Sequence, residues 1–167
     1  MNYAQVRKFD VANGTGIRTS LFVSGCTHNC PSCFNRDYQD FNYGLAWNRR
    51  IEEQLLDYVA DKNVVGLSLL GGEPFQNTRE LINLTTNLKK RYPNKTIWVW
   101  SGYTYEEIVK DQYKLGLLKN CDVLVDGRFI EELKDITLRF RGSSNQRIIN
   151  VQLSLEEGVV VLYEFCK

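Results

Sequence analysis

The chain has 167 residues and a formal net charge of +1, with 43% hydrophobic and 25% charged residues. These values are typical of one globular domain, so residues 1–167 are expected to form a single domain. A chain so nearly neutral has no basic field to hold nucleic acid or an anionic membrane, and neither is expected as a partner. No apolar run approaches the roughly 20 residues of a membrane helix, and the first residues lack a secretory pattern. The expected location is therefore the cytoplasm, where thiols stay reduced.

Short apolar runs alternate with amphipathic segments along most of the chain. The runs predict strands at residues 19–25, 64–72, 95–102 and 121–127. The segments between them predict helices over residues 48–62, 77–92 and 104–118. Asn77 or Thr78 can cap the second helix, and Thr104 with Glu107 forms a capping box for the third.

This β-α alternation predicts an α/β fold with parallel strands joined by right-handed crossovers. A complete eight-unit barrel needs about 250 residues. The expected architecture is therefore a partial βα barrel, open on one side, and an open side can admit a large partner. Sites in such folds lie at the carboxyl ends of the strands. The loops 25–35, 71–74, 101–102 and 126–127 are expected on one rim.

Three cysteines lie within eight residues, at Cys26, Cys30 and Cys33. Structural zinc sites and iron–sulfur clusters usually take four protein ligands. A [4Fe–4S] cluster held by three cysteines would leave one iron free to take a substrate. Two other interpretations remain: His28 could complete a Cys₃His zinc site, or the three cysteines could be unrelated buried residues. The iron–sulfur interpretation is favoured because the spacing is unusual for zinc and no second ligand pair is present.

The spacing Cys26-x3-Cys30-x2-Cys33 resembles the signature of the radical S-adenosylmethionine enzymes. The sequence LLGGEPF at residues 69–75 resembles the glycine-glycine-glutamate-proline motif of that superfamily. The resemblance implies that the open iron binds S-adenosylmethionine. It also implies that the backbone around Gly71 and Gly72, with Glu73, binds the methionine amine. The residue types suit this role, because glycine permits close approach of a ligand and a carboxylate accepts from an ammonium.

Four stretches, at residues 13–35, 98–107, 122–135 and 139–151, resemble the glycyl-radical-activating enzymes that act on anaerobic ribonucleoside-triphosphate reductases. That family reductively cleaves S-adenosylmethionine to a 5′-deoxyadenosyl radical, which takes hydrogen from a reductase glycine. The implied cofactors are one [4Fe–4S] cluster and S-adenosylmethionine. The implied partners are the large reductase subunit and a flavodoxin-type or other one-electron donor. Cys26, Cys30 and Cys33 then carry the catalysis as cluster ligands.

Other positions are softer candidates for the cofactor site. Many superfamily members have an aromatic residue just before the third cysteine, but here Ser32 holds that position and Phe34 follows Cys33. Residues 32–34 are expected close to the adenosyl group, with Phe34 either stacking on adenine or packing in the core. Ser101 and Asp126 end two strands and are candidates for the ribose or methionine part. Their alternative role is to stabilise turns.

The remaining marked residues are first assigned structural roles. Arg18 and Arg128 are expected to be exposed, with contact to carboxylate or partner groups as the alternative. Residues 141–147 either dock the partner or form a plain surface loop. Trp98 and Trp100 are assigned to core packing, Cys121 to burial as a small apolar residue, and Cys166 is expected to be a thiol without a role. Two other functions stay open: another small radical S-adenosylmethionine enzyme acting on a metabolite, and a zinc-binding interaction module.

Overall fold

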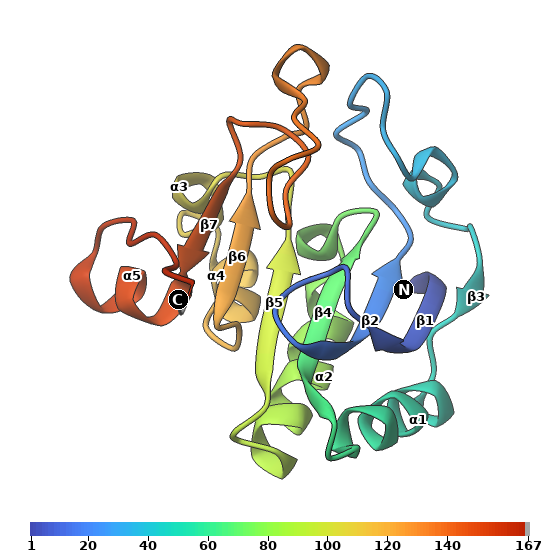
Figure 1. The fold of residues 1–167 in the computed structure, drawn as a ribbon. Helices are drawn as coiled ribbons and strands as arrows, with labels where there is room; N and C mark the ends of the chain where they lie inside the picture. Colours follow the sequence, from blue (N-terminus) through green and yellow to red (C-terminus); the bar gives the residue numbers. More distant parts are fainter. Residues whose placement is uncertain (166–167) are drawn as a thin grey trace.

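A computed structural model describes residues 1–165, so the predicted exposed thiol of Cys166 lies outside the described residues. One mixed sheet has the strand order β3-β1-β2-β4-β5-β6-β7 (Figure 1). The strands are β1 (Asn2–Asp10), β2 (Ile17–Val23), β3 (Leu45–Ala46), β4 (Val64–Gly71), β5 (Thr96–Trp100), β6 (Val123–Asp126) and β7 (Arg147–Asn150). The helices are α1 (Arg49–Ala60), α2 (Thr78–Arg91), α3 (Tyr105–Ile108), α4 (Gln112–Leu118) and α5 (Val151–Glu157). Three 3₁₀ turns are η1 (Arg36–Gln39), η2 (Pro74–Gln76) and η3 (Glu131–Leu133).

The four central strands β2, β4, β5 and β6 run parallel, which confirms the predicted α/β fold with parallel strands for the middle of the sheet. The edges differ, because β1 pairs antiparallel with β2 and with β3, and β7 pairs antiparallel with β6. The sequence prediction omits β1, β3, β7 and α5. It also places β2 two residues too late, at 19–25, and extends β4, β5 and β6 by one or two residues at one or both ends. No helix within residues 1–165 combines the length and the apolar character needed to cross a membrane.

The helix starts follow local capping chemistry. Thr104 and Glu107 form the predicted capping box at α3. The predicted single helix 104–118 is wrong, however, because Asp111 accepts hydrogen bonds from Tyr113 N and Lys114 N and so starts α4 as a second helix. Asn77 precedes α2 but its side chain does not cap it. The Asn77 amide instead donates to the main-chain oxygens of Ser24 and Glu73, at the edge of the site.

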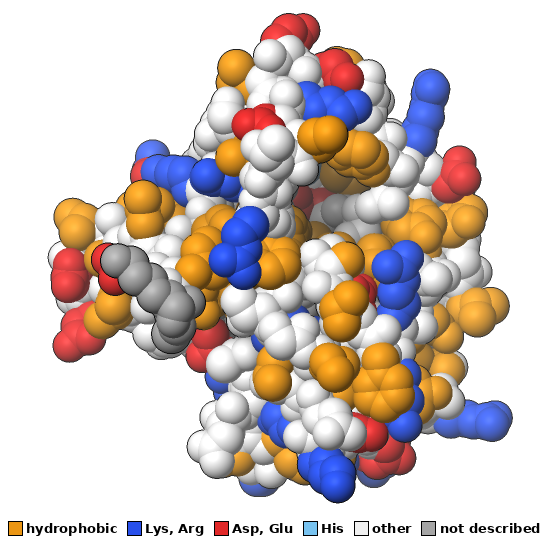
Figure 2. Space-filling model, in the orientation of Figure 1, with side chains coloured by type: hydrophobic (Ala, Val, Ile, Leu, Met, Phe, Trp, Pro, Cys, Tyr) orange, Lys and Arg blue, Asp and Glu red, His pale blue; other side chains and the backbone are white. Residues whose placement is uncertain are grey.

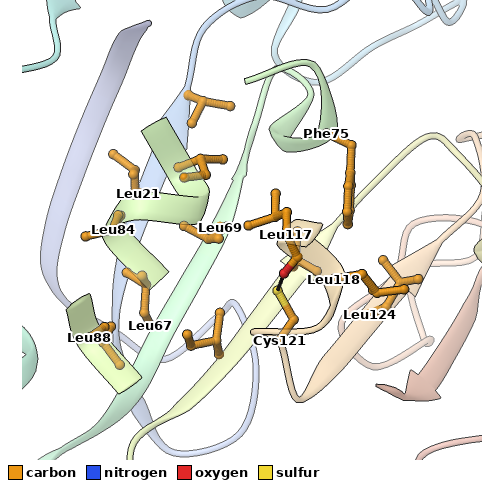
Figure 3. Packing of buried hydrophobic residues seen from close by; sticks show 14 of the residues in the cluster. Leu21, Leu67, Leu69, Phe75, Leu84, Leu88, Leu117, Leu118, Cys121 and Leu124 are labelled. Carbon is orange, nitrogen blue, oxygen red and sulfur yellow. Dashed lines mark hydrogen bonds between the residues drawn. The ribbon is translucent and has the colours of Figure 1, made fainter. Parts of the chain in front are cut away.

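Helices α1, α2 and α4 cover one face of the sheet, and leucines from strands and helices fill the space between them (Figures 1 and 3). Leu67 and Leu69 of β4 meet Leu84 and Leu88 of α2 in this cluster. Burial of such side chains is the main stabilising term of the fold. Cys121 is fully buried in the same core, as predicted, and its Sγ donates to the Leu117 carbonyl at 3.4 Å.

The prediction that Arg18 is exposed is wrong. Its side chain is fully buried on the opposite face of the sheet, packed over Trp98. Its guanidinium donates to Ser68 Oγ at 2.8 Å, to the Leu67 carbonyl at 2.8 Å and to Thr96 at its carbonyl and hydroxyl. Burial lowers the Arg18 pKa to about 10, so the cation persists at neutral pH. The β1–β2 loop crosses this face in Figure 1 and covers it, and the Asn13 carbonyl accepts from Ser68 Oγ.

Candidate active site

The carboxyl ends of β2, β4, β5 and β6 meet at one edge of the sheet and surround a cavity of about 210 Å³. In Figure 1 this edge lies at the top, between the loop after β2 and the loop after β6. Eight of the ten predicted site residues line the cavity: Cys26, Cys30, Cys33, Phe34, Gly71, Gly72, Glu73 and Ser101. The topology therefore brings together loops that lie far apart in the sequence, as the parallel order predicts.

The two glycines let the β4 turn pack directly on the cysteine loop. Gly72 N donates to the Val23 carbonyl and Glu73 N donates to the Gly25 carbonyl, each at 2.8 Å. A Cβ on Gly71 would lie 2.6 Å from the Val23 oxygen, and one on Gly72 would lie 2.6 Å from the Gly25 oxygen. Gly71 also has a φ of +111°, which other residues rarely adopt. Any side chain here would push the turn and the cysteine loop apart.

The Glu73 carboxylate is buried at the centre of the site, and its hydrogen-bonding capacity is used up. Oε1 accepts from Phe75 N at 3.0 Å and from Ser101 Oγ at 2.9 Å. Oε2 accepts from Gly102 N at 2.8 Å and contacts His28 Nε2 at 2.9 Å. Each carboxylate oxygen has about two acceptor positions, so four partners saturate the group. The Gly72 carbonyl, in contrast, accepts no hydrogen bond from residues 1–165.

His28 fixes the cysteine loop to the rest of the site. Its ring is buried, bonded to Glu73 and packed edge-on against Tyr103, with ring centroids 4.4 Å apart. One residue earlier, Thr27 N donates to Gln76 Oε1 at 3.0 Å, and Gln76 Nε2 donates to Thr27 Oγ1 at 2.8 Å. The segment between the first two cysteines is thus attached to the turn after β4 and to the turn after β5. The sequence alone does not indicate the bond from His28 to Glu73, because the two residues are 45 positions apart.

The three thiols are half-buried around the same cavity. The pKa of Cys26 is raised to about 11, chiefly by burial. A hydrogen bond with the His28 backbone opposes this rise, and the charges of Glu73, Cys30 and Cys33 contribute to it. The pKa of Cys30 is also raised, first by burial and then by Cys33. Thiolates crowded in this way repel one another, and a bound cationic centre would relieve that repulsion. The donor set therefore suits a metal centre.

A single metal ion and an iron–sulfur cluster make different demands on these side chains. Within residues 1–165, no group of three or more His, Cys, Asp or Glu side chains is placed to hold one metal ion. A cluster contacts its cysteines at separate irons, so the sulfurs need only surround a cavity. A Cys₃His zinc site would also require His28, whose Nε2 is bonded to Glu73.

Two predicted residues, Ser32 and Asp126, do not line the cavity. Ser32 is exposed, with a φ of +57°, and borders a second hollow that residues of the cysteine loop line with Arg36 and Gln39. Asp126 is buried beneath the rim, where its Oδ2 accepts from Tyr105 N at 2.7 Å and its Oδ1 accepts from Arg147 Nε at 3.0 Å. These contacts match the alternative role of Asp126 in stabilising the turn.

Arg147 joins Asp126 to Glu106, and this contact gives a pH-dependent prediction. Its guanidinium donates to Glu106 Oε1 at 3.0 Å and lowers the Glu106 pKa from its ordinary value of 4.5 to about 2. A depressed carboxyl pKa stabilises the fold above pH 4.5, and this contribution is lost as the pH falls toward 2. We expect the unfolding free energy of wild type to fall more between pH 6 and pH 3 than that of Glu106→Gln. The difference between these two losses of unfolding free energy should be below about 1 kcal/mol, because the Glu106 carboxylate is half-exposed. Equal losses in denaturant titrations, with Glu156→Gln as control, would remove this role.

Several residues of the cavity wall were missed from the sequence. The core packing predicted for Trp98 and Trp100 is confirmed, since Trp98 is buried and Trp100 packs against the same cluster. Trp100 is only half-buried, however, and it also lines the cavity and donates from Nε1 to the Phe140 carbonyl at 2.8 Å. Phe129 and Gln146 come from the loop after β6. The available signal for Phe129 was its proximity to the predicted strand end at residue 127, and Gln146 lies within the marked segment 141–147. Arg128 is exposed, as predicted, and its charge partly offsets the rise in the Cys30 pKa.

Comparisons with known proteins show the family to which the chain belongs. A model of the family described as a 4Fe-4S single cluster domain matches residues 12–149, so the chain belongs to a class of iron–sulfur cluster proteins. The chain is 41% identical over 150 residues to the anaerobic ribonucleoside-triphosphate reductase-activating protein of Escherichia coli (strain K12), covering 87% of this chain and 96% of that protein. It is 41% identical over 157 residues to the protein of that name from Haemophilus influenzae, covering 92% and 100%. It is 38% identical over 150 residues to the one from Enterobacteria phage T4, covering 89% and 93%. The chain belongs to the family of anaerobic ribonucleoside-triphosphate reductase-activating proteins.

Proposed function

We propose that the chain is a single radical S-adenosylmethionine domain that activates an anaerobic ribonucleoside-triphosphate reductase. The observation that carries the proposal is that Cys26, Cys30, Cys33 and the Gly71–Glu73 turn line one cavity. When bound there, the [4Fe–4S] cluster and S-adenosylmethionine supply one-electron cleavage of the sulfonium to methionine and a 5′-deoxyadenosyl radical, which takes a hydrogen atom from a reductase glycine. Its expected place is the cytoplasm. The central parallel strands would form the curved wall of an open βα barrel.

The residues of this chain bind and orient the reactants. The three cysteines hold the cluster and leave one iron without a protein ligand. The Gly72 carbonyl, which accepts no hydrogen bond within residues 1–165, would accept from the methionine ammonium, and Glu73 would fix the turn that carries it. Phe34 and Trp100 would supply apolar walls for the adenosyl group. Ser101 orients the Glu73 carboxylate by donating to its Oε1. Ser32 and Asp126 are assigned supporting roles at the edge of this site.

The proposed partners are the large reductase subunit, which carries the glycine, and a flavodoxin-type or other one-electron donor. Enzymes of the same superfamily that act on metabolites would share the cysteine loop and the glycine turn. The relatives from Escherichia coli, Haemophilus influenzae and phage T4 are all named for activating a reductase, which favours a protein substrate. A zinc-binding interaction module would leave the buried Glu73 and the glycine turn without a purpose.

The proposal is tested on protein reconstituted with iron and sulfide without oxygen, and then reduced. We expect an electron paramagnetic resonance signal from a reduced cluster that changes when S-adenosylmethionine is added. A ligand-dependent change would support the open iron. Absence of a cluster signal, with about one zinc bound per chain, would overturn the proposal and favour the zinc module.

A further inference from the structure

An exposed group of apolar side chains borders the mouth of the cavity. Two segments contribute to it: the cysteine loop and the loop of residues 127–146. We call this group the apolar rim. Its members Phe34, Ile130, Leu133 and Ile136 are exposed, and Phe129 is half-buried. Phe34 is 71% exposed and Ile136 is 91% exposed, values that are unusual for large apolar residues. In Figure 2 a hollow opens on the upper part of the molecule, with hydrophobic side chains on its border.

The apolar rim is continuous with the site. Phe34 and Phe129 both line the cavity, and their ring centroids lie 5.2 Å apart, so the cysteine loop and the 127–146 loop touch at the mouth. Lys134 lies over the Phe34 ring at 5.7 Å, which places the outer part of the 127–146 loop beside the same ring. Leu133 and Ile136 lie on either side of Lys134 in the sequence and are exposed as well.

The 127–146 loop holds these side chains in place by its own hydrogen bonds. Ser144 N donates to the Leu133 carbonyl at 2.8 Å, and a β-bridge joins Lys134 to Ser143. Gln146 accepts from Gly142 N at 2.8 Å and donates to the Gly127 carbonyl at 2.9 Å. The loop is therefore pre-organised, and its apolar side chains stay exposed when they could have been folded inward. Exposed apolar groups that are held in this way mark interaction sites.

We infer that the apolar rim is the docking surface for the polypeptide segment of the reductase that carries the glycine. The inference rests on the proposed function. A glycine within a chain can reach the cavity only if the residues on both sides of it cross the mouth, where the rim lies. The charges nearby, on Glu131, Glu132 and Lys134, are of both signs, and the whole chain carries only +1. The surface therefore fits an uncharged, apolar segment, because it has no field that would select a charged one.

The test replaces apolar residues that do not line the cavity. Ile136→Asp and Leu133→Asp each place a charge in the rim and leave the walls of the cavity intact. We expect both variants to bind the reductase at least tenfold more weakly in anaerobic equilibrium titrations, because buried apolar contacts dominate such interfaces. Cluster content and the spectroscopic response to S-adenosylmethionine should stay at wild-type values. Val159→Asp, which changes an exposed valine beyond α5, is the matched control and should bind normally.

The outcomes separate this inference from the proposed function. One outcome is that wild-type protein binds S-adenosylmethionine and activates the reductase while both rim variants bind the reductase as tightly as wild type. In that case the docking inference fails and the proposed function stands. If the rim variants change the sedimentation of the activating protein by itself and leave reductase affinity unchanged, the rim joins two copies of this chain and the inference is overturned. If wild type holds no cluster, the proposed function fails first.

Discussion

Cys30→Ala is expected to reduce glycyl-radical formation to an undetectable level. Cys30 is the middle one of the three proposed cluster ligands, and it lines both the main cavity and the hollow beside Ser32. A cluster with only three protein ligands should not tolerate the loss of one, because removal of a thiolate leaves a second iron exposed to solvent. The iron and sulfide content of the reconstituted variant should fall with its activity. The measurement is the glycyl-radical signal of the reductase, quantified per mole of reductase.

The matched control is Cys121→Ala. This cysteine is fully buried in the leucine core, away from the cavity, so the change should cost about 1 kcal/mol of stability and leave the cluster and the activity intact. Cys26→Ala and Cys33→Ala should behave like Cys30→Ala, while Cys166→Ala should be nearly silent. Full radical formation by Cys30→Ala would refute the cluster assignment.

The centre of the fold could be predicted from sequence because its signals are local. The apolar runs that become β4 and β6 are mostly buried, and short runs of this kind are typical of strands covered on both faces. The missed strands lack that signal. β1 is only partly buried and carries Arg7 and Lys8, β3 has two residues, and β7 has four. They form because the neighbouring strand offers unpaired hydrogen-bonding groups, which is a tertiary cause.

The site shows the same division between local and long-range information. The cysteine spacing and the glycine turn can be recognised in the sequence, and the alternation of elements predicts that they meet. The contacts that organise the meeting cannot be predicted in this way. Nothing around His28 indicates that it will bond to Glu73, and nothing around Arg18 indicates that it will be buried among the carbonyls of β4 and β5. An arginine is expected to be exposed from its residue type alone, but tertiary contacts with Ser68, Leu67 and Thr96 bury Arg18.

Glu73→Ala is expected to weaken S-adenosylmethionine binding by about a hundredfold while the cluster remains. The carboxylate is buried and accepts from four groups on three segments. Its removal leaves buried donors without partners and releases the turn that presents the Gly72 carbonyl, at a cost of about 1.5–3 kcal/mol for each bond to a charged group. Affinity is measured by equilibrium titration of the reconstituted protein. Glu156→Ala, at an exposed position on α5, is the control. Unchanged affinity would remove Glu73 from the site.

His28→Ala then decides how Glu73 acts. If the carboxylate bound the methionine ammonium directly, the loss of His28 would free an acceptor position, and S-adenosylmethionine would bind as well as before or more tightly. If Glu73 acts by fixing the turn and the cysteine loop together, the loss of His28 loosens that connection. The saturated carboxylate favours the second role, so we expect His28→Ala to weaken binding at least tenfold with normal iron content. His28→Gln should recover part of the loss, because the amide N–H can donate to Glu73. Tighter binding by His28→Ala would show that Glu73 contacts the ligand itself.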